Sequence, residues 1–290
     1  MHMLRLWLFI AGLWLHAAGA VTVVDDRQVS VTLTQAPQRV VTLLPSLAET
    51  VCVLGACARL VGTDKHANWP ASVKTLPKLG GLDDTQLEAL VRLKPDLVLL
   101  AKSARITAKL EAMGIPVLAL EPQTPSDMQR VLQTVAVVLH LPDAQRQAAQ
   151  VWQGIQLQIH KAQARMPAQA LNATVYLEAS TGGYAAGESS FIGEVLRQLG
   201  LKNIVPSEMG AFPQLNPEYV VRANPDLIVL AQPMVTKLSQ RPGWSGISAI
   251  KLHRVCTFSA EQADMLVRPG PRLGEAAQLI SDCVQSRFAL

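Results

Sequence analysis

Short apolar runs alternate with amphipathic stretches along most of the chain, as expected of strands followed by helices. Residues 40–44 form a continuous apolar run typical of a buried parallel strand. Residues 45–54 have helical spacing and end at Gly55, a residue suited to closing a helix. Similar runs predict further strands over 60–63, 117–120, 174–178 and 254–258, and a hairpin over 21–33. Strands alternating with helices predict α/β lobes with mainly parallel sheets.

Two segments, 85–101 and 215–231, repeat one another at a constant offset of 130 residues. Each reads as a short helix, a Pro-Asp break and an apolar strand. Glu88 matches Glu218, so each predicted helix carries one glutamate at the same position. An internal repeat of this kind implies two similar lobes, and two lobes imply a cleft between them. The first hypothesis is therefore a two-lobed binding protein.

The longest uninterrupted helical stretch runs from Asp143 to Arg165. At about 1.5 Å per residue it would span roughly 34 Å, enough to join two lobes rigidly. We therefore expect an N-terminal lobe over 21–140, a connecting helix within 141–168 and a C-terminal lobe over 169–290.

The predicted loops should gather at one edge of each sheet. Ligands of α/β lobes bind at the carboxyl ends of the strands. The segments after residues 44, 63, 101, 178, 231 and 258 are therefore expected to line the cleft. They include a glycine-rich loop over 180–190 and a loop over 260–270, which precedes a terminal helix over 271–286.

The N-terminus has the three parts of a secretory signal peptide. Arg5 precedes an apolar core over 6–15, and Ala18-Gly19-Ala20 offers a small-residue cleavage site. The apolar run is shorter than the ~20 residues that a bilayer span needs. We expect removal of residues 1–20 and a soluble exported protein with no lipid anchor, since no cysteine follows the cleavage site. The alternative is a buried N-terminal helix.

Charge gives no sign of a nucleic-acid partner. The chain has 26 basic and 22 acidic residues, a formal net charge of +4, and no dense run of Lys or Arg. An oxidising compartment would make all four cysteines disulfide candidates: Cys52, Cys57, Cys256 and Cys283. Pairing within each lobe is the simplest of the three connectivities that four cysteines allow. Their spacing and the lack of neighbouring histidines argue against a zinc site.

Several motifs, in order, resemble one known family. RVVTLLPSLAETVCVLGACARLVG (39–62) is followed by Trp69-Pro70, LPKLGG (76–81) and LEALVRLKPDLVLLA (87–101). They are similar to the helical-backbone periplasmic substrate-binding proteins of ABC importers, the receptors for cobalamin, haem and ferric siderophores. The resemblance runs from about Arg39 to the C-terminus and is nearest to the vitamin B12-binding components. It implies a monomer with two α/β lobes, one bridging helix and a cleft that opens and closes little.

The resemblance also implies a role for the two matched glutamates. In this family one surface glutamate on each lobe docks against arginines of the permease, and the match falls on Glu88 and Glu218. Charge-assisted pairs at both lobes would fix the orientation of the complex. The alternative is that both are ordinary solvated helix residues.

A corrinoid of the vitamin B12 type is the transported ligand that the resemblance implies first. Haem or a ferric siderophore is the alternative, and no catalytic cofactor is expected. Such ligands need aromatic faces, a few hydrogen-bond donors and sometimes an axial ligand. The candidates on the predicted cleft loops are His66, Trp69, Lys102, Tyr184, Phe212, Met265 and Arg268.

Two of these candidates have specific chemistry. His66 could stack on the ligand, hydrogen-bond a side amide or bind the iron of haem. Arg268 could pair with a propionate, phosphate or carboxylate, or serve only in a surface salt bridge. Leu82 and Ala101 fall where cobalamin receptors often have tryptophan, so the cleft is expected to be less aromatic than theirs.

Other classes of function lack their motifs. A free-ion receptor would need several converging histidines and carboxylates, and two of the four histidines beyond residue 20 lie in or beside predicted helices away from the cleft. No GxSxG or HExxH string occurs, and the cysteines do not suit a metal-cluster oxidoreductase. We therefore expect a binding protein rather than an enzyme or a structural protein.

Overall fold

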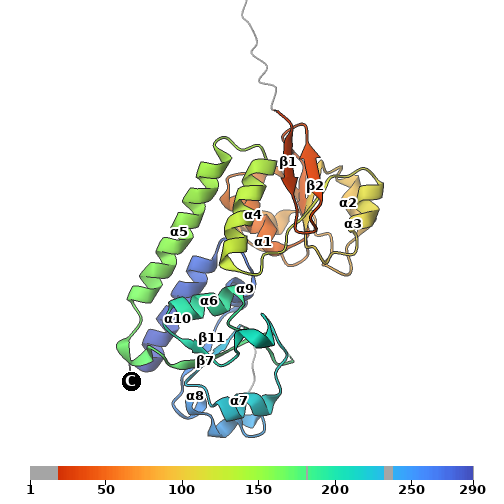
Figure 1. Cartoon of the computed structure of the whole chain (residues 1–290). Helices are drawn as coiled ribbons and strands as arrows, with labels where there is room; N and C mark the ends of the chain where they lie inside the picture. Colours follow the sequence, from red (N-terminus) through yellow and green to blue (C-terminus); the bar gives the residue numbers. More distant parts are fainter. Residues whose placement is uncertain (1–18, 181, 232–237, 290) are drawn as a thin grey trace, which may run out of the picture.

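The computed structural model describes residues 19–180, 182–231 and 238–289. Two α/β lobes lie one above the other in an elongated molecule, as the sequence predicts (Figure 1). The predicted signal peptide falls almost entirely outside the described residues. Within the described ranges, no helix has both the length and the apolar character needed to span a membrane.

The N-terminal lobe is built on a parallel sheet with the strand order β4-β3-β5-β6. Its strands are β3 (Val40–Thr42), β4 (Leu60–Thr63), β5 (Leu97–Leu100) and β6 (Val117–Ala119). Its helices are α1 (Pro45–Val53), α2 (Leu87–Arg92), α3 (Thr107–Ala112) and α4 (Pro125–Val138). The predicted hairpin is present as antiparallel β1 (Val21–Val24) and β2 (Ser30–Leu33). Helices cover both faces, which explains why the strands are continuously apolar.

The C-terminal lobe repeats this arrangement. Its strands are β7 (Thr174–Ser180), β8 (Tyr184–Ala185), β9 (Lys202–Asn203), β10 (Leu227–Leu230) and β11 (Val255–Thr257). Its helices are α6 (Phe191–Gln198), α7 (Pro217–Ala223), α8 (Ser248–Lys251), α9 (Ala260–Val267) and α10 (Leu273–Phe288). The parallel order β9-β7-β10-β11 matches β4-β3-β5-β6, and β8 adds an antiparallel strand beside the end of β7.

The predicted repeat is confirmed as α2–β5 in one lobe and α7–β10 in the other. The aspartate of the Pro-Asp break makes equivalent hydrogen bonds in both copies of the repeat. Asp96 accepts hydrogen bonds from the backbone N–H groups of Gln38 (2.8 Å) and Arg39 (2.9 Å). Asp226 accepts from the N–H (2.9 Å) and the hydroxyl (2.8 Å) of Thr174. Each aspartate therefore ties the start of one central strand to the start of its parallel neighbour.

Helix α5 (Ala144–Ala164) is the long helix that the sequence predicts. It packs against α4 of the N-terminal lobe and α10 of the C-terminal lobe (Figure 1). Its buried residues include Ile155, Ile159 and Ala162, which lie on one face. The Ser281 hydroxyl of α10 donates to the Ala162 carbonyl at 2.9 Å. One helix thus shares its apolar face between both lobes.

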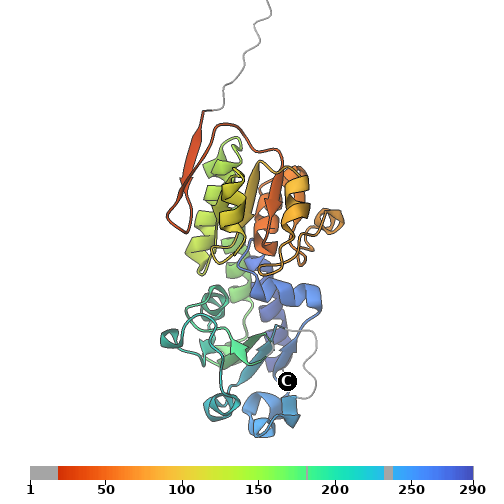
Figure 2. The same cartoon turned by 90° about the vertical axis from the view of Figure 1, so that its right-hand side faces the viewer.

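The predicted loop over 260–270 is wrong, because most of it is helix α9. The helix begins at a capping box: the Gln262 N–H donates to the Ser259 hydroxyl (3.3 Å), and the Ser259 N–H donates to the Gln262 side chain (3.0 Å). This Ser-x-x-Gln spacing is a helix-start signal that the sequence contains. Figure 2 shows the α9–α10 segment at the junction of the lobes.

The glycine-rich loop is also interrupted by structure. Tyr184, predicted at the tip of that loop, lies in β8 and pairs with the end of β7. Gly182 and Gly183 have φ of 84° and 80°, the left-handed conformation that makes this tight reversal possible. Helix α4 is capped by Thr124, whose hydroxyl accepts a hydrogen bond from the Asp127 N–H.

Each lobe contains one disulfide, formed between cysteines of that lobe. Cys52–Cys57 joins the end of α1 to the turn after it, and Cys256–Cys283 joins β11 to α10. The simplest of the three connectivities is therefore the one that the structure has. Each bridge ties a helix to the segment beside it, and neither links the lobes.

Candidate ligand-binding site

A cleft of about 490 Å³ lies between the lobes. The N-terminal lobe contributes the start of α1, His66 after β4, Ser103 after β5 and Glu121 after β6. The C-terminal lobe contributes Phe191 at the start of α6, Phe212 and the end of α9. Most of these residues follow the carboxyl ends of strands, as predicted for this fold.

The cleft walls are mainly apolar. Phe191 and Phe212 stand with ring centroids 5.8 Å apart and an angle of 49° between the ring planes. Leu82 lines the cleft from the other lobe, together with Ala101. Leu82 and Phe212 are partly exposed, at 38% and 36%, and are separated by the repeat offset of 130 residues. Just before the duplicated unit, each lobe thus presents one apolar side chain to the cleft.

Arg268 borders the cleft, but protein groups already occupy its guanidinium. Its Nη1 donates to Glu49 (3.1 Å) and to the side-chain oxygen of Asn68 (2.7 Å). Its Nη2 donates to the His66 carbonyl (3.0 Å) and pairs with Asp264 (2.8 Å). The side chain is 10% exposed. Arg268 therefore holds the cleft together, and a ligand anion would have to compete with two carboxylates for it.

Arg272 completes an interlobe ion-pair network that we define as Glu49, Asp264, Arg268 and Arg272. It donates to both carboxylate oxygens of Glu49, at 3.1 and 2.9 Å. Glu49 belongs to α1 of the N-terminal lobe and both arginines to the C-terminal lobe, and the Glu49 side chain is 1% exposed. The two positive and two negative charges balance. Buried ions require such pairing, because desolvation of an unpaired charge is costly.

The backbone of His66 is held by hydrogen bonds, whereas its side chain is exposed. Its N–H donates to Asp64 Oδ1 at 2.7 Å, and its carbonyl accepts the bond from Arg268. Asp64 is buried, and this burial raises the pKa of its carboxyl. The imidazole is exposed in the cleft and has no hydrogen-bond or ion-pair partner in the part of the chain that the structure describes.

Four predicted site residues lie outside the cleft lining. Trp69 borders a separate cavity of about 270 Å³, with the Arg272 guanidinium 5.2 Å from its ring centroid. Lys102 borders a cavity of about 540 Å³ in the N-terminal lobe. Tyr184 projects from β8 and is 43% exposed, whereas Met265 packs against the core. The structure thus brings His66, Phe212 and Arg268 together and leaves these four apart.

Most of the lining residues were not predicted as site residues, and Glu121 and Phe191 are two of them. Glu121 follows β6, so the rule that strand ends face the cleft could have identified it. Its side chain accepts a 3.2 Å hydrogen bond from the Ser103 N–H. Phe191 is the first residue of α6 and is only 2% exposed, so only its contact with the partly exposed Phe212 marks it as part of the site.

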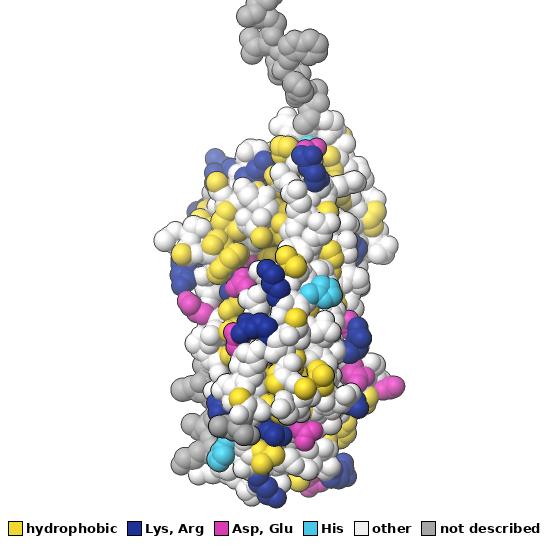
Figure 3. Space-filling view, turned by 90° about the vertical axis from the view of Figure 1, so that its left-hand side faces the viewer, with side chains coloured by type: hydrophobic (Ala, Val, Ile, Leu, Met, Phe, Trp, Pro, Cys, Tyr) yellow, Lys and Arg dark blue, Asp and Glu magenta, His cyan; other side chains and the backbone are white. Residues whose placement is uncertain are grey.

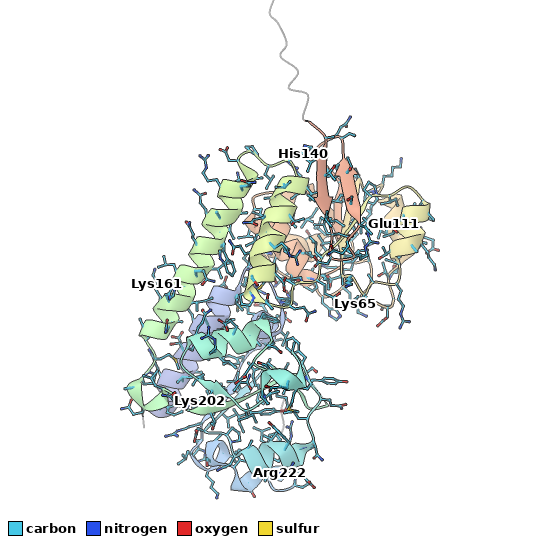
Figure 4. The ribbon with its side chains drawn as sticks, in the orientation of Figure 1. Lys65, Glu111, His140, Lys161, Lys202 and Arg222 are labelled. Carbon is cyan, nitrogen blue, oxygen red and sulfur yellow. A yellow bond between two sulfur atoms is a disulfide. The ribbon has the colours of Figure 1, made fainter. Side chains whose placement is uncertain are left out.

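Charges elsewhere on the surface are dispersed. Figure 3 shows basic and acidic side chains interspersed on the face that carries α5. Lys65, at the edge of the N-terminal lobe in Figure 4, pairs with Asp84 at 2.8 Å. His140 lies in the N-terminal lobe, away from the C-terminal lobe (Figure 4). Among the described residues, no group of three or more His, Cys, Asp or Glu side chains could hold a metal ion.

Glu88 and Glu218 occupy equivalent places. Each lies in the first turn of its helix, α2 or α7, with an exposed side chain. Figure 1 places both helices to the right of α5, one in each lobe. Neither carboxylate takes part in an ion pair within residues 19–180, 182–231 and 238–289. Both are therefore accessible to a basic partner.

Known proteins are similar to this chain in sequence and in fold. The substrate-binding lipoprotein YvrC of Bacillus subtilis, described as an uncharacterized ABC transporter component, is 28% identical over 274 residues, 91% of this chain and 85% of the relative. A cobalamin-binding protein of Halobacterium salinarum is 31% identical over 216 residues, 72% of this chain and 58% of that protein. The structure of a periplasmic haem-binding protein from Pseudomonas aeruginosa matches with a TM-score of 0.72 at 22% identity, covering 87% of this chain and 93% of the other.

The family described as "Periplasmic binding protein" matches residues 40–261. This range includes both sheets, α5 and the cleft residues up to the start of α9. The match covers well over half of the sequence, and the chain therefore belongs to the periplasmic binding protein family.

Proposed function

We propose that this chain is the substrate-binding component of an ABC importer, exported by a cleaved signal peptide, and that it captures a corrinoid in the interlobe cleft. It delivers this ligand to the permease and catalyses no reaction. The cobalamin-binding relative at 31% identity supports the ligand class. Export agrees with the family to which the chain belongs.

The observation that carries the corrinoid proposal is the charge of the cleft. Its one Lys or Arg lining residue among those described is Arg268, which is engaged by Glu49 and Asp264. Glu121 adds a negative charge. Haem carries two propionates, and many ferric siderophores are anionic. The negative charges of either ligand would find no unpaired cation among the described lining residues. A corrinoid ring carries its periphery largely as neutral amides, which this cleft can accommodate without charge pairing.

The apolar walls suit a large flat ring. Ligand sites typically have volumes of about 300–1,000 Å³ and are lined by hydrophobic and aromatic side chains with a few polar groups. This cleft has Phe191 and Phe212 on one side and Leu82 on the other, and its polar groups include His66 and Glu121. Ring stacking on Phe212, which Phe191 supports from the core, would supply affinity, and the polar groups would set orientation.

Haem is the second candidate, and the free imidazole of His66 is the observation that favours it. A histidine is a common axial ligand of haem iron. A haem complex would nevertheless leave its propionates without a cationic partner among the described lining residues. The corrinoid is therefore preferred.

Docking to the permease is assigned to Glu88 and Glu218. Both are exposed, lie on matched helices of the two lobes and have no ion-pair partner among the described residues. Two carboxylates at fixed separation can pair with arginines of a permease and set the orientation of the complex.

Calorimetric titration with cyanocobalamin and haemin tests the ligand assignment. We expect saturable binding of cyanocobalamin and weak or no binding of haemin. Phe212→Ala should weaken cyanocobalamin binding about two- to tenfold, since an aromatic contact is worth about 0.5–1.5 kcal/mol beyond its buried area. Tyr184→Ala, which removes an exposed aromatic outside the cleft lining, is the matched control and should bind as the unaltered protein does. Tight haemin binding without cyanocobalamin binding would replace the corrinoid by haem.

A further inference from the structure

The segment after β4 presents one metal-ligating side chain to the cleft. His66 is the only histidine among the described lining residues, and its ring is exposed there without a protein partner in the described chain. An exposed imidazole without a protein partner is hydrated by water, which a ligand can displace. This imidazole is available to something that enters the cleft.

The backbone of His66 is held from both lobes. On one side its N–H is bound by Asp64, whose own N–H donates to the Thr42 carbonyl at 2.9 Å. On the other side its carbonyl is bound by Arg268, which Glu49 holds in the interlobe ion-pair network. The position of the ring is thus limited mainly to rotation about its own side-chain bonds. Binding a ligand atom through such a residue requires little loss of backbone freedom.

Few other groups in the cleft compete for this role. Asp264 is paired with Arg268 and accepts a 2.7 Å hydrogen bond from Asn68. Glu121 is a hard oxygen donor, whereas imidazole is a preferred ligand of several first-row transition metals. His160 lies on α5 and does not line the cleft.

We propose that His66 coordinates the cobalt of the bound corrinoid through an imidazole nitrogen, taking the place of a weakly held axial water. This inference rests on the proposed corrinoid function. One Co–N bond forms and one Co–O bond breaks. The neutral imidazole supplies its electron pair, the water leaves with its own, and cobalt remains Co(III) with no proton or electron transferred.

Such a bond makes the protein selective for corrinoids with an exchangeable axial ligand. Cyanide is held strongly by Co(III), so cyanocobalamin can use the cleft walls but gains nothing from the imidazole. Aquacobalamin can bind through the cleft walls and through the imidazole. The preference between the two forms is therefore a measure of the His66 bond, separate from the affinity for the ring itself.

The test is a parallel titration of the untagged protein with aquacobalamin and cyanocobalamin, followed by absorption spectroscopy and calorimetry. We expect the aquacobalamin spectrum to shift to that of a nitrogen-ligated cobalt, with a dissociation constant about tenfold lower than for cyanocobalamin, or ~1.4 kcal/mol. The cyanocobalamin spectrum should keep its axial-ligand bands. In His66→Ala the shift should vanish and the two dissociation constants should become equal.

His160→Ala is the matched control and should keep both the shift and the tenfold ratio, because this exposed histidine lies on α5. A bound aquacobalamin with an unshifted spectrum, or a shift that persists in His66→Ala, overturns the cobalt bond and leaves corrinoid capture standing. Failure of both corrinoids to bind overturns the corrinoid assignment and the cobalt bond together.

Discussion

The two lobes share their scaffold and differ where they face the cleft. The unit α7–β10 closely resembles the unit α2–β5. Even the left-handed residue that follows each helix is repeated, at Lys94 and Asn224, with φ of 46° in both. Outside this unit, equivalent positions diverge: Leu82 of one lobe corresponds to Phe212 of the other, and both line the cleft. The positions that build the sheet are repeated, and those that line the cleft are not.

The polar groups of the cleft are divided unequally. The N-terminal lobe supplies His66 and Glu121, whereas the charged groups of the C-terminal lobe, Asp264 and Arg268, pair with one another beside the aromatic ring of Phe212. A ligand held between them would have one polar contact surface and one stacking surface. A flat ring with a reactive metal and apolar faces has this asymmetry, which two identical lobes would not match.

The largest effect should come from separating the lobes at their buried ion pairs. Glu49→Ala would leave Arg268 and Arg272 buried without their shared carboxylate. Removing one partner of a buried ion pair costs about 3–5 kcal/mol. We expect that loss in the free energy of unfolding, measured by urea denaturation, and a weaker corrinoid complex, because Arg268 also holds His66.

The matched control is Glu261→Gln. Glu261 pairs with Lys74 of the other lobe at 3.0 Å, but both side chains are largely exposed, at 73% and 52%. Exposed ion pairs contribute little to stability, so this variant should unfold like the unaltered protein. Equal stability of the Glu49 and Glu261 variants would show that the buried network does not hold the lobes together.

A smaller effect is expected from the aspartate that the two repeats share. Asp96→Ala and Asp226→Ala each remove two hydrogen bonds at the start of a central strand. Unpairing such donors costs about 1–3 kcal/mol. The loss should be larger at Asp226, because its partner Thr174 is half-buried while Gln38 and Arg39 are exposed to water.

Denaturation of the two variants under identical conditions measures this difference. A larger loss for the Asp96 variant would contradict the solvation argument. Absence of any loss in both would mean that the repeated Pro-Asp pair has no structural role, and the resemblance between the lobes would then need another cause.

The sequence was sufficient to predict most of the fold because its signals are local. Apolar runs bounded by glycine and proline predicted the strands of the two sheets, and the internal repeat predicted two lobes. Strand β9 was missed because two residues, Lys202 and Asn203, show no apolar run. Helix α9 was missed because its capping box was read as part of a loop. The first error concerns a two-residue strand whose conformation depends on its pairing with β7. The second overlooked a local signal that the sequence contains.

The cleft was predicted less completely, because its contacts join residues that are distant in sequence. The strand-end rule identified His66 correctly as a lining residue. It could not show that Arg268 is engaged by Glu49, which lies 219 residues away. Trp69 was predicted to line the cleft. It instead borders a separate cavity, where the Arg272 guanidinium lies over its ring. Such pairings arise only when the lobes are assembled.

The smallest effect on the folded protein should come from Glu88 and Glu218, the matched residues that face solvent. Glu88→Ala and Glu218→Ala should each leave unfolding and ligand affinity unchanged, because neither carboxylate has an ion-pair partner in the described chain and neither lines the cleft. Permease-dependent uptake should fall in each variant and be lost in the double variant. Arg222→Ala, on the last turn of α7 (Figure 4), is the control and should transport normally.

The double variant separates docking from general surface charge. If each glutamate pairs with its own arginine on the permease, the two losses are independent and multiply, since contacts far apart contribute additively to free energy. Restoring one carboxylate should then restore only part of the uptake. Normal uptake by the double variant would contradict docking at these positions and would leave the equivalence of Glu88 and Glu218 as a consequence of duplication alone.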